Sequence, residues 1–538
     1  MRKEDLDCRQ REVIKAVLEG DCKILVLGGS GTGKTTTALW CARESLEHAA
    51  ISPKPRVLFL TFSRSAVSQI THRSPGVISG YDDSVEIMTF HALAYRLLRS
   101  FGRYAGYGTT SPSIQSEAKR KLLGQGPGQL VYDDLLPAAI RILKSSKIRR
   151  LISSRWHLII CDEVQDTNKE QWNLLQLLAP RKLLLLGDAH QMIYTFIPGV
   201  SPERFSQIRA SVDREIELRP VSYRDPSGAI PALAEAIRVR RFDDEAVKEA
   251  LRSRRLTVLS YPDELSLQEL INAQVASGYR KEIGIFAHSN AAVTELADQL
   301  SEAGIEHVLV GIPEAHAEAL SAMSTQCAYA VGLATTADIR TTLALYLTAT
   351  VRGREAPDLA RALIGNLSLP GQIEEAISQL EIALRAAVDG TISDLASVAA
   401  QSWGRLRITR SSRPWQRAAS HFRRLIYSYR NEEVSIATIT RLVEVIERSR
   451  VEALIDLDYS ERGRIRLMNY HQTKGREADV VIHIFRNDDY FGREGEPFEE
   501  LSRLLNVALS RARERVIVLL PSDPHPLVEP FSALIQDS

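Results

Sequence analysis

The stretch "KILVLGGSGTGKTTTALWCARESL", residues 23–46, joins an apolar strand pattern, a glycine-rich turn and a helix-forming segment. Its centre, "GGSGTGKT" (28–35), fits the pattern G-x-x-x-x-G-K-[ST]. Glycines let backbone N–H groups close around phosphate oxygens, and the helix N-terminus adds its positive dipole end. We therefore expect a phosphate-binding loop, with Lys34 at the β- and γ-phosphates and Thr35 as a Mg²⁺ ligand. The loop comprises Gly28, Gly29, Ser30, Gly31, Thr32 and Gly33.

A second motif, "IICDEVQD" (159–166), places two carboxylates at the end of another apolar run. In a phosphate-loop fold, the strand that carries such a motif ends beside the loop. Asp162 is then expected to hold Mg²⁺, and Glu163 to accept a proton from the attacking water or to orient it. Together the two motifs predict nucleotide hydrolysis.

Short apolar runs recur along the chain and set the expected fold class. They are "RVLFLTF" (56–62), "WHLIICD" (156–162), "KLLLLGD" (182–188), "KEIGIFAHS" (281–289), "DVVIHIF" (479–485) and "RVIVLL" (515–520). Such runs are typical of strands buried on both faces of a parallel sheet. Helical patterns lie between them, so we expect an α/β protein with two units. Because there is one phosphate loop for two units, the second unit is expected to complete the site.

The expected domain boundaries follow from these patterns. We place a first ATPase lobe at 1–91 and 156–217, with a helical insertion at 92–155. A second lobe comprises 218–312 and 456–538, with a reduced helical insertion at 313–455.

Composition excludes some classes of protein. The 538 residues are 44% hydrophobic and 25% charged, with a net charge of +1. No apolar run approaches the roughly 20 residues that span a bilayer, and the first residues have no apolar stretch for a secretory signal. Five scattered cysteines indicate neither a disulfide framework nor a zinc site. We therefore expect a cytoplasmic protein with no membrane partner.

One segment of the chain, residues 403–430, has a strong excess of positive charge. Residues 403–430 contain eight arginines, no Asp or Glu, two tryptophans and two tyrosines. One interpretation is a solvated helix face that pairs with acids elsewhere in the fold. The other is a surface for nucleic acid or for an acidic protein partner.

The motifs together resemble a known family. "DEVQD" is similar to the DExQD signature of UvrD/Rep-type superfamily 1 DNA helicases. Other segments resemble the family's motifs in the same order, over almost the whole chain. They are "LDCRQ" (6–10), "LFLTFSRSAV" (58–67), "IMTFHALAYRLL" (87–98), "GDAHQMIYTF" (187–196), "SYRDPSGAI" (222–230), "MNYHQTKGREADVV" (468–481) and "RLLNVALSRARERVIVL" (503–519).

The resemblance implies two RecA-like P-loop lobes with ATP between them, and Mg²⁺ as the second cofactor. Arg224 and Arg511 match the family's γ-phosphate arginines, and Gln191 its γ-phosphate sensor. Around the nucleoside, Gln10 matches the adenine-reading glutamine, Tyr223 the stacking aromatic and Glu477 a carboxylate near the ribose. Many members have arginine directly after the GKT of the loop, where this chain has Thr36.

The resemblance also implies a track for one DNA strand. The matching residues are Thr61, Phe62, Phe90, His91, Tyr194, Phe196 and His471. Aromatic faces would stack on bases and polar groups would donate to phosphates. The alternative for each aromatic residue is a place in the hydrophobic core.

Three functions remain open at this point. The first is an ATP-dependent translocase and helicase on single-stranded or tailed DNA, moving 3′→5′ as the resemblance implies. It would act in repair, replication restart or defence against foreign DNA. The second is a nucleic-acid-stimulated ATPase switch that remodels a partner protein. The third is an RNA-directed motor. Because the chain ends soon after the last motif, we expect a compact member without a nuclease domain.

Overall fold

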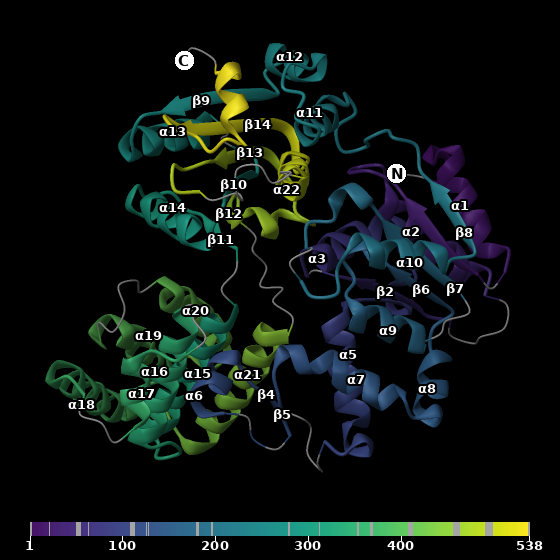
Figure 1. Ribbon diagram of the computed structural model, residues 1–538. Coiled ribbons are helices and arrows are strands. Elements are labelled where there is room, and N and C mark those ends of the chain that lie inside the picture. Colours follow the sequence, from purple (N-terminus) through teal and green to yellow (C-terminus); the bar gives the residue numbers. More distant parts are fainter. Residues whose placement is uncertain are drawn as a thin grey trace. The chain divides into compact units, whose positions relative to one another are not determined.

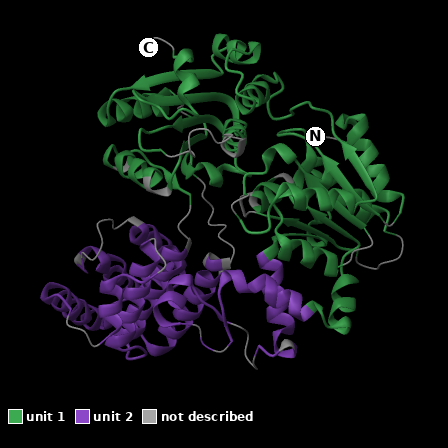
Figure 2. Cartoon of the chain, in the orientation of Figure 1, with its two compact units in different colours: residues 1–90, 143–311, 460–538 green, residues 91–142, 312–459 purple. Residues whose placement is uncertain are grey.

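The computed structural model describes most of the chain in two compact units (Figures 1 and 2). Unit 1 comprises residues 1–90, 143–311 and 460–538, and unit 2 comprises 91–142 and 312–459. The described residues are 3–20, 22–49, 55–62, 64–107, 113–124, 126, 128–178, 182–194, 197–277, 280–310, 313–351, 355–365, 369–406, 413–455, 463–489 and 499–535.

The first sheet of unit 1 is six-stranded and each of its pairings is parallel. Its order is β3 (Val85–Thr89), β2 (Val57–Thr61), β6 (Leu158–Cys161), β7 (Lys182–Gly187), β1 (Lys23–Leu27) and β8 (Arg214–Glu217). The central strands are almost wholly buried, which explains their continuous apolar sequences. Since all strands run the same way, the segments that follow them emerge at one edge.

Helices accompany this sheet along the chain. They are α1 (Cys8–Leu18), α2 (Lys34–Glu47), α3 (Arg64–Arg73), α4 (Pro75–Ile78), α8 (Ser146–Ser153), α9 (Lys169–Leu178) and α10 (Pro202–Ala210). Helix α1 begins with a capping box, in which the Asp7 side chain accepts from the Gln10 backbone and the Gln10 side chain accepts from the Asp7 backbone. Helix α8 belongs to unit 1, so the boundary between the units falls at Leu143 and not near residue 155.

The second sheet of unit 1 also has six parallel strands. Its order is β11 (Val308–Leu309), β12 (Ile465–Asn469), β10 (Ile283–Ala287), β13 (Ala478–Ile484), β14 (Ala512–Pro521) and β9 (Leu256–Tyr261). The accompanying helices are α11 (Ala229–Arg238), α12 (Glu245–Arg252), α13 (Glu264–Ser277), α14 (Asn290–Glu302) and α22 (Glu499–Leu509). The predicted fold class, α/β with two parallel sheets and helical insertions, is confirmed.

Unit 2 is mainly helical and is built from both insertions. The first contributes α5 (Phe90–Phe101), β4 (Ser113–Ile114), α6 (Glu117–Leu123), β5 (Gln129–Leu130) and α7 (Leu135–Leu143). The second contributes α15 (Pro313–Ala330), α16 (Thr336–Thr350), α17 (Asp358–Ile364), α18 (Gly371–Ala386), α19 (Ile392–Leu406), α20 (Arg413–Leu425) and α21 (Ile436–Ile455). The Glu314 carboxylate accepts from the Ala118 backbone, and Arg450 donates to the Ile114 carbonyl at 3.1 Å. The two insertions therefore share one fold.

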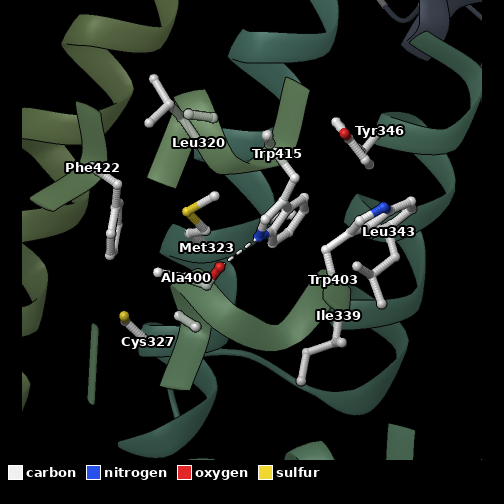
Figure 3. Packing of buried hydrophobic residues seen from close by; sticks show 14 of the residues in the cluster. Leu320, Met323, Cys327, Ile339, Leu343, Tyr346, Ala400, Trp403, Trp415 and Phe422 are labelled. Carbon is white, nitrogen blue, oxygen red and sulfur yellow. Dashed lines mark hydrogen bonds between the residues drawn. The ribbon is translucent and has the colours of Figure 1, made fainter. Parts of the chain in front are cut away.

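The aromatic residues of the arginine-rich segment are divided between core and surface. Trp403 and Trp415 stack with ring centroids 5.3 Å apart, and Trp415 Nε1 donates to the Ala400 carbonyl at 2.9 Å (Figure 3). Both tryptophans are buried in the core of unit 2, so they are not available to stack on bases. Arg423 and Arg424 are exposed on α20. The side chains of residues 405, 407, 410 and 413 lie outside the described part of the chain.

Within the described residues, no helix combines the length and the hydropathy that crossing a membrane requires.

Candidate nucleotide and nucleic-acid site

A cavity of about 440 Å³ lies in unit 1 and is lined by segments from both sheets. The phosphate loop follows β1, the acidic motif follows β6, and Gln191 follows β7, so all three leave the same edge of the first sheet. The second sheet contributes Glu477, directly before β13, and Arg511, directly before β14. Among the predicted nucleotide and metal residues, those that line the cavity are Gly29, Ser30, Gly31, Thr32, Gly33, Lys34, Thr35, Thr36, Asp162, Glu163, Gln191, Tyr223, Arg224, Glu477 and Arg511.

Two glycines of the loop have backbone conformations that other residues rarely adopt. Gly31 and Gly33 have φ values of 78° and 86°. A Cβ at Gly31 would lie 2.4 Å from Ser222 Oγ, and one at Gly33 would lie 2.6 Å from Gln10 Nε2. The loop therefore needs glycine for conformation and for close approach. Lys34 Nζ donates to the Gly28 carbonyl at 2.5 Å, which keeps the ammonium group inside the loop.

The adjacent acids Asp162 and Glu163 have different surroundings. Glu163 has φ 55°, a left-handed conformation that costs a non-glycine residue energy and is concentrated at functional sites. Burial and then the Glu163 charge raise the pKa of Asp162. Burial also acts to raise the pKa of Glu163, but the Lys474 and Lys34 cations outweigh it and hold this pKa below its usual range. Glu163 is thus ionised at neutral pH.

The oxygens of Thr35 and Asp162 fit a Mg²⁺ site. Thr35 Oγ1 donates to Asp162 Oδ2 at 3.3 Å, so both oxygens face the same part of the cavity. Mg²⁺ takes oxygen ligands, commonly one or two from protein and the rest from phosphates and water. A cation here would also offset the buried charge of Asp162. The described residues contain no cluster of three His, Cys, Asp or Glu side chains that could hold a metal without such phosphates.

A buried amide network holds Glu163 in place. Gln165 Nε2 donates to Glu163 Oε2 at 2.7 Å, while Gln165 Oε1 accepts from the Asp188 backbone at 3.1 Å. Gln191 Nε2 donates to Asp188 Oδ2 at 2.9 Å, which joins the segment after β7 to the same network. The glutamine of the "DEVQD" motif therefore has a positioning contact, which the site prediction did not include.

Two arginines meet at the phosphate loop. Arg224 donates to Ser30 Oγ at 2.6 Å and to Glu477 Oε1 at 2.6 Å. Arg511 donates to Ser30 Oγ at 3.1 Å and to Gln191 Oε1 at 3.4 Å. Burial and then the charge of Arg224 lower the pKa of Arg511 to about 9, so Arg511 remains a cation at neutral pH. Two neighbouring guanidinium groups at this loop favour binding of a polyanion.

Lys474 was not among the predicted site residues, yet it connects the two sheets beside the cavity. It lies in the segment between β12 and β13, and it is buried. Its ammonium group pairs with the Asp166 carboxylate, donates to the Gln191 carbonyl at 2.7 Å and lies 3.5 Å from Glu163 Oε2. Burial acts against this cation, but Asp166 and Glu163 outweigh burial and raise the pKa of Lys474. The sequence shows this lysine within "HQTKGRE", but it gives no sign of the lysine's partners, which lie some 300 residues earlier in the chain.

The predicted nucleic-acid residues divide into two groups. Phe62 packs on Tyr194 with ring centroids 4.8 Å apart, and Tyr194 donates its hydroxyl to the His471 carbonyl at 2.9 Å. Lys474 Nζ lies 5.7 Å from the Tyr194 ring centroid, so this group adjoins the nucleotide site.

The second group does not present open faces. Thr61 and Phe90 are buried, at 0% and 1% exposure, which favours the core interpretation for Phe90. His91 stacks on Tyr132 with centroids 3.8 Å apart. Phe196 lies outside the described residues.

Comparisons with known proteins agree with the motifs. A family profile described as an AAA domain matches residues 10–197. The ATP-dependent DNA helicase PcrA of Bacillus subtilis (strain 168) is 20% identical over 380 residues, which are 56% of this chain and 50% of that protein. A probable DNA helicase II homolog of Mycoplasma pneumoniae is 25% identical over 278 residues, 39% of this chain and 38% of that protein.

The chain thus spans about half, or less, of the length of the curated relatives it matches. A crystal structure of Pif1 helicase from Candida albicans aligns with 50% of this chain and 54% of that chain at 16% identity, with a TM-score of 0.29 that is too low to support an inference. The resemblance of the chain to UvrD/Rep-like superfamily 1 DNA helicases is confirmed.

The buried contact between Lys474 and Asp166 leads to a prediction. Replacing Lys474 by Met leaves a buried carboxylate without its cation, which costs about 3–5 kcal/mol of unfolding free energy. The double variant Lys474→Met/Asp166→Asn removes both charges and should recover most of that loss. Urea unfolding of the wild type, both single variants and the double variant measures the coupling. Strictly additive costs would contradict the pairing.

Proposed function

We propose that this chain hydrolyses ATP and uses the energy to move along single-stranded DNA, as a translocase and helicase. One observation carries the proposal. Lys474 contacts Glu163, Asp166 and the Gln191 carbonyl at the nucleotide cavity, and it also lies against the ring of Tyr194 in the candidate DNA track. The Lys474 side chain alone therefore connects the γ-phosphate end of the cavity with the aromatic pair of Phe62 and Tyr194.

The chemical step follows from the charges at the cavity. Lys34, Arg224 and Arg511 place three cations around the position of the γ-phosphate, where they offset charge in the transition state. Glu163 is ionised and held by Gln165, so it orients the attacking water at the strand end. Mg²⁺ held by Thr35 and Asp162 would neutralise charge on the phosphate oxygens.

The mechanical step follows from the division of the site between two sheets. Bound ATP would contact the phosphate loop on the first sheet and both Glu477 and Arg511 on the second. ATP binding therefore favours a closed arrangement of the two sheets, and ATP hydrolysis allows the two sheets to separate again. If the two halves of the protein hold the DNA strand alternately during this cycle of ATP binding and hydrolysis, the cycle moves the protein along the strand in steps. The resemblance to UvrD/Rep-type helicases implies that this movement runs 3′→5′. The exposed Arg423 and Arg424 on α20 offer a surface for DNA or for an acidic protein partner.

Strand displacement tests this function. With ATP and a 3′-tailed duplex, the wild type should release the displaced strand, and Glu163→Gln should be slower by about 10²–10⁴-fold because the water is no longer oriented by a carboxylate. The matched control is Glu203→Gln, which makes the same change at an exposed site on α10 and should match the wild type. Equal rates for Glu163→Gln and the wild type would refute the assignment. A preference for the 5′-tailed duplex would refute the direction.

The candidate DNA track is tested separately at Phe62. Phe62 is half-buried, and its ring packs on Tyr194 from one side. Phe62→Ala should weaken binding of an oligo(dT) strand by about 1–3 kcal/mol, the usual contribution of one base stacked on an aromatic residue. Fluorescence anisotropy measures the affinity, and Leu265→Ala, which removes an exposed apolar side chain on α13, is the control. If both variants bind as the wild type does, Phe62 does not contact the strand.

A further inference from the structure

Helix α20 of unit 2 (Figure 1) has one buried face and one exposed face. The buried face carries Trp415 and Phe422 into the core of the unit. The exposed face begins with Gln416 and Ser420 and continues, through the last turn of α20 into the short helix η8 (Tyr427–Tyr429), with a basic group around one aromatic ring. Side chains three or four residues apart on a helix are neighbours, so this group forms one surface. We define the α20 surface as Arg423, Arg424, Tyr427 and Arg430.

Tyr427 is the aromatic residue of the α20 surface, and it is 64% exposed. The guanidinium carbon of Arg430 lies 3.9 Å from the centroid of its ring, and Arg430 Nη1 donates to the Tyr427 carbonyl at 2.8 Å. One face of the ring is therefore held against a cation. Because so much of the residue is exposed, the other face is open to a planar group.

The arginines of the α20 surface are not neutralised by nearby acids. In the part of the chain that the structure describes, Arg423 and Arg424 form no ion pair. Residues 403–430 contain no Asp or Glu. Two acids follow, and one of them, Glu432, is already paired with Arg441 at 2.8 Å. The excess of positive charge is therefore available to an anionic partner.

The chemistry of the surface favours an unpaired nucleic-acid strand over an acidic protein. A protein interface usually has an apolar core, whereas the other exposed side chains described on α20 and η8 are the polar Gln416, Ser420 and Ser428. An aromatic face beside cations that bind phosphates is the combination that holds single strands without sequence preference. In a duplex the base faces are stacked on one another, so only an unpaired strand offers a base to Tyr427.

We infer that the α20 surface is a second binding site for single-stranded DNA, formed by unit 2 alone and additional to the candidate track in unit 1. Tyr427 stacks on one base, and Arg423 and Arg424 contact the neighbouring phosphates. The inference goes beyond the proposed function, because binding here requires no nucleotide hydrolysis. It rests on that function only for the choice of DNA over RNA.

Photochemical crosslinking locates the strand on the protein. The full chain is irradiated without nucleotide in the presence of an oligo(dT) strand that carries 5-iodouracil, and the tryptic peptides are mapped by mass spectrometry. Adducts are expected on the peptide 425–430, which contains Tyr427. If adducts form elsewhere and none maps to this peptide, the second site is refuted. Since no nucleotide is present, a failure of the proposed hydrolysis would not alter this result.

Binding measurements assign the contact to individual side chains. In a Phe62→Ala background, which weakens the candidate track, Tyr427→Ala should weaken oligo(dT) binding by a further factor of about ten, because one stacked base is lost. The double change Arg423→Gln/Arg424→Gln should reduce the slope of log K against log salt concentration by about 1.4, since each phosphate contact on a single strand contributes about 0.7. The control Ile382→Ala removes an exposed apolar side chain on α18 and should change neither quantity.

The same variants distinguish the inference from its alternatives. An unchanged affinity in Tyr427→Ala together with an unchanged salt slope in the double arginine variant would refute the site. A labelled polyglutamate peptide is the probe for an acidic protein partner. If it binds the wild type and loses affinity in the double arginine variant while oligo(dT) binding is unaffected, the surface recognises protein and the inference is wrong. Tighter binding of single-stranded RNA than of oligo(dT) in the Phe62→Ala background would overturn the choice of DNA.

Discussion

The ion pair between Lys474 and Asp166 is the contact on which the rest of the site depends. Removing two charges from water costs several kcal/mol for each ion, so a buried lysine is stable only where its partners are well placed. Lys474 meets this condition with Asp166, Glu163 and the Gln191 carbonyl. These partners follow β6 and β7 of the first sheet, whereas Lys474 precedes β13 of the second. The contact therefore fixes the two halves of the cavity against each other.

Strand order brings the candidate nucleotide residues and the candidate nucleic-acid residues to the same edge of the first sheet. In the first sheet, β1 and β6 end directly beside the nucleotide cavity and the segment after β7 reaches it, while β2 and β3 end at Thr61 and Thr89, in the segments that resemble DNA-contacting motifs. All strands are parallel, so both functions use one edge of one sheet. Tyr194 and His471 continue this edge into the second sheet through their hydrogen bond. Lys474 contacts both the Gln191 carbonyl and the Tyr194 ring, so the proposed coupling between the two sites needs only this one side chain.

The sequence predicted the parts of this structure that rest on local patterns. The phosphate loop and the central strands follow from continuous apolar runs, and each of those runs is a strand. Strand β8 was missed because three of its four residues are charged and only Ile216 is buried, as befits an edge strand. Lys474 was missed because its importance depends on partners distant in sequence. The burial of the tryptophans at 403 and 415 in the core of unit 2 could not be predicted, since composition does not indicate which face of a helix is covered.

The central claim is that the nucleotide site and the DNA track are coupled, and ATP hydrolysis measured with and without nucleic acid tests it most directly. The rate should rise by about tenfold or more with saturating single-stranded DNA, because a strand held at Phe62 and Tyr194 orders the segment that positions Lys474 and Gln191. Single-stranded RNA and blunt duplex DNA should stimulate hydrolysis less. Equal rates with and without single-stranded DNA would contradict the coupling. Stronger stimulation by RNA would identify a motor that acts on RNA.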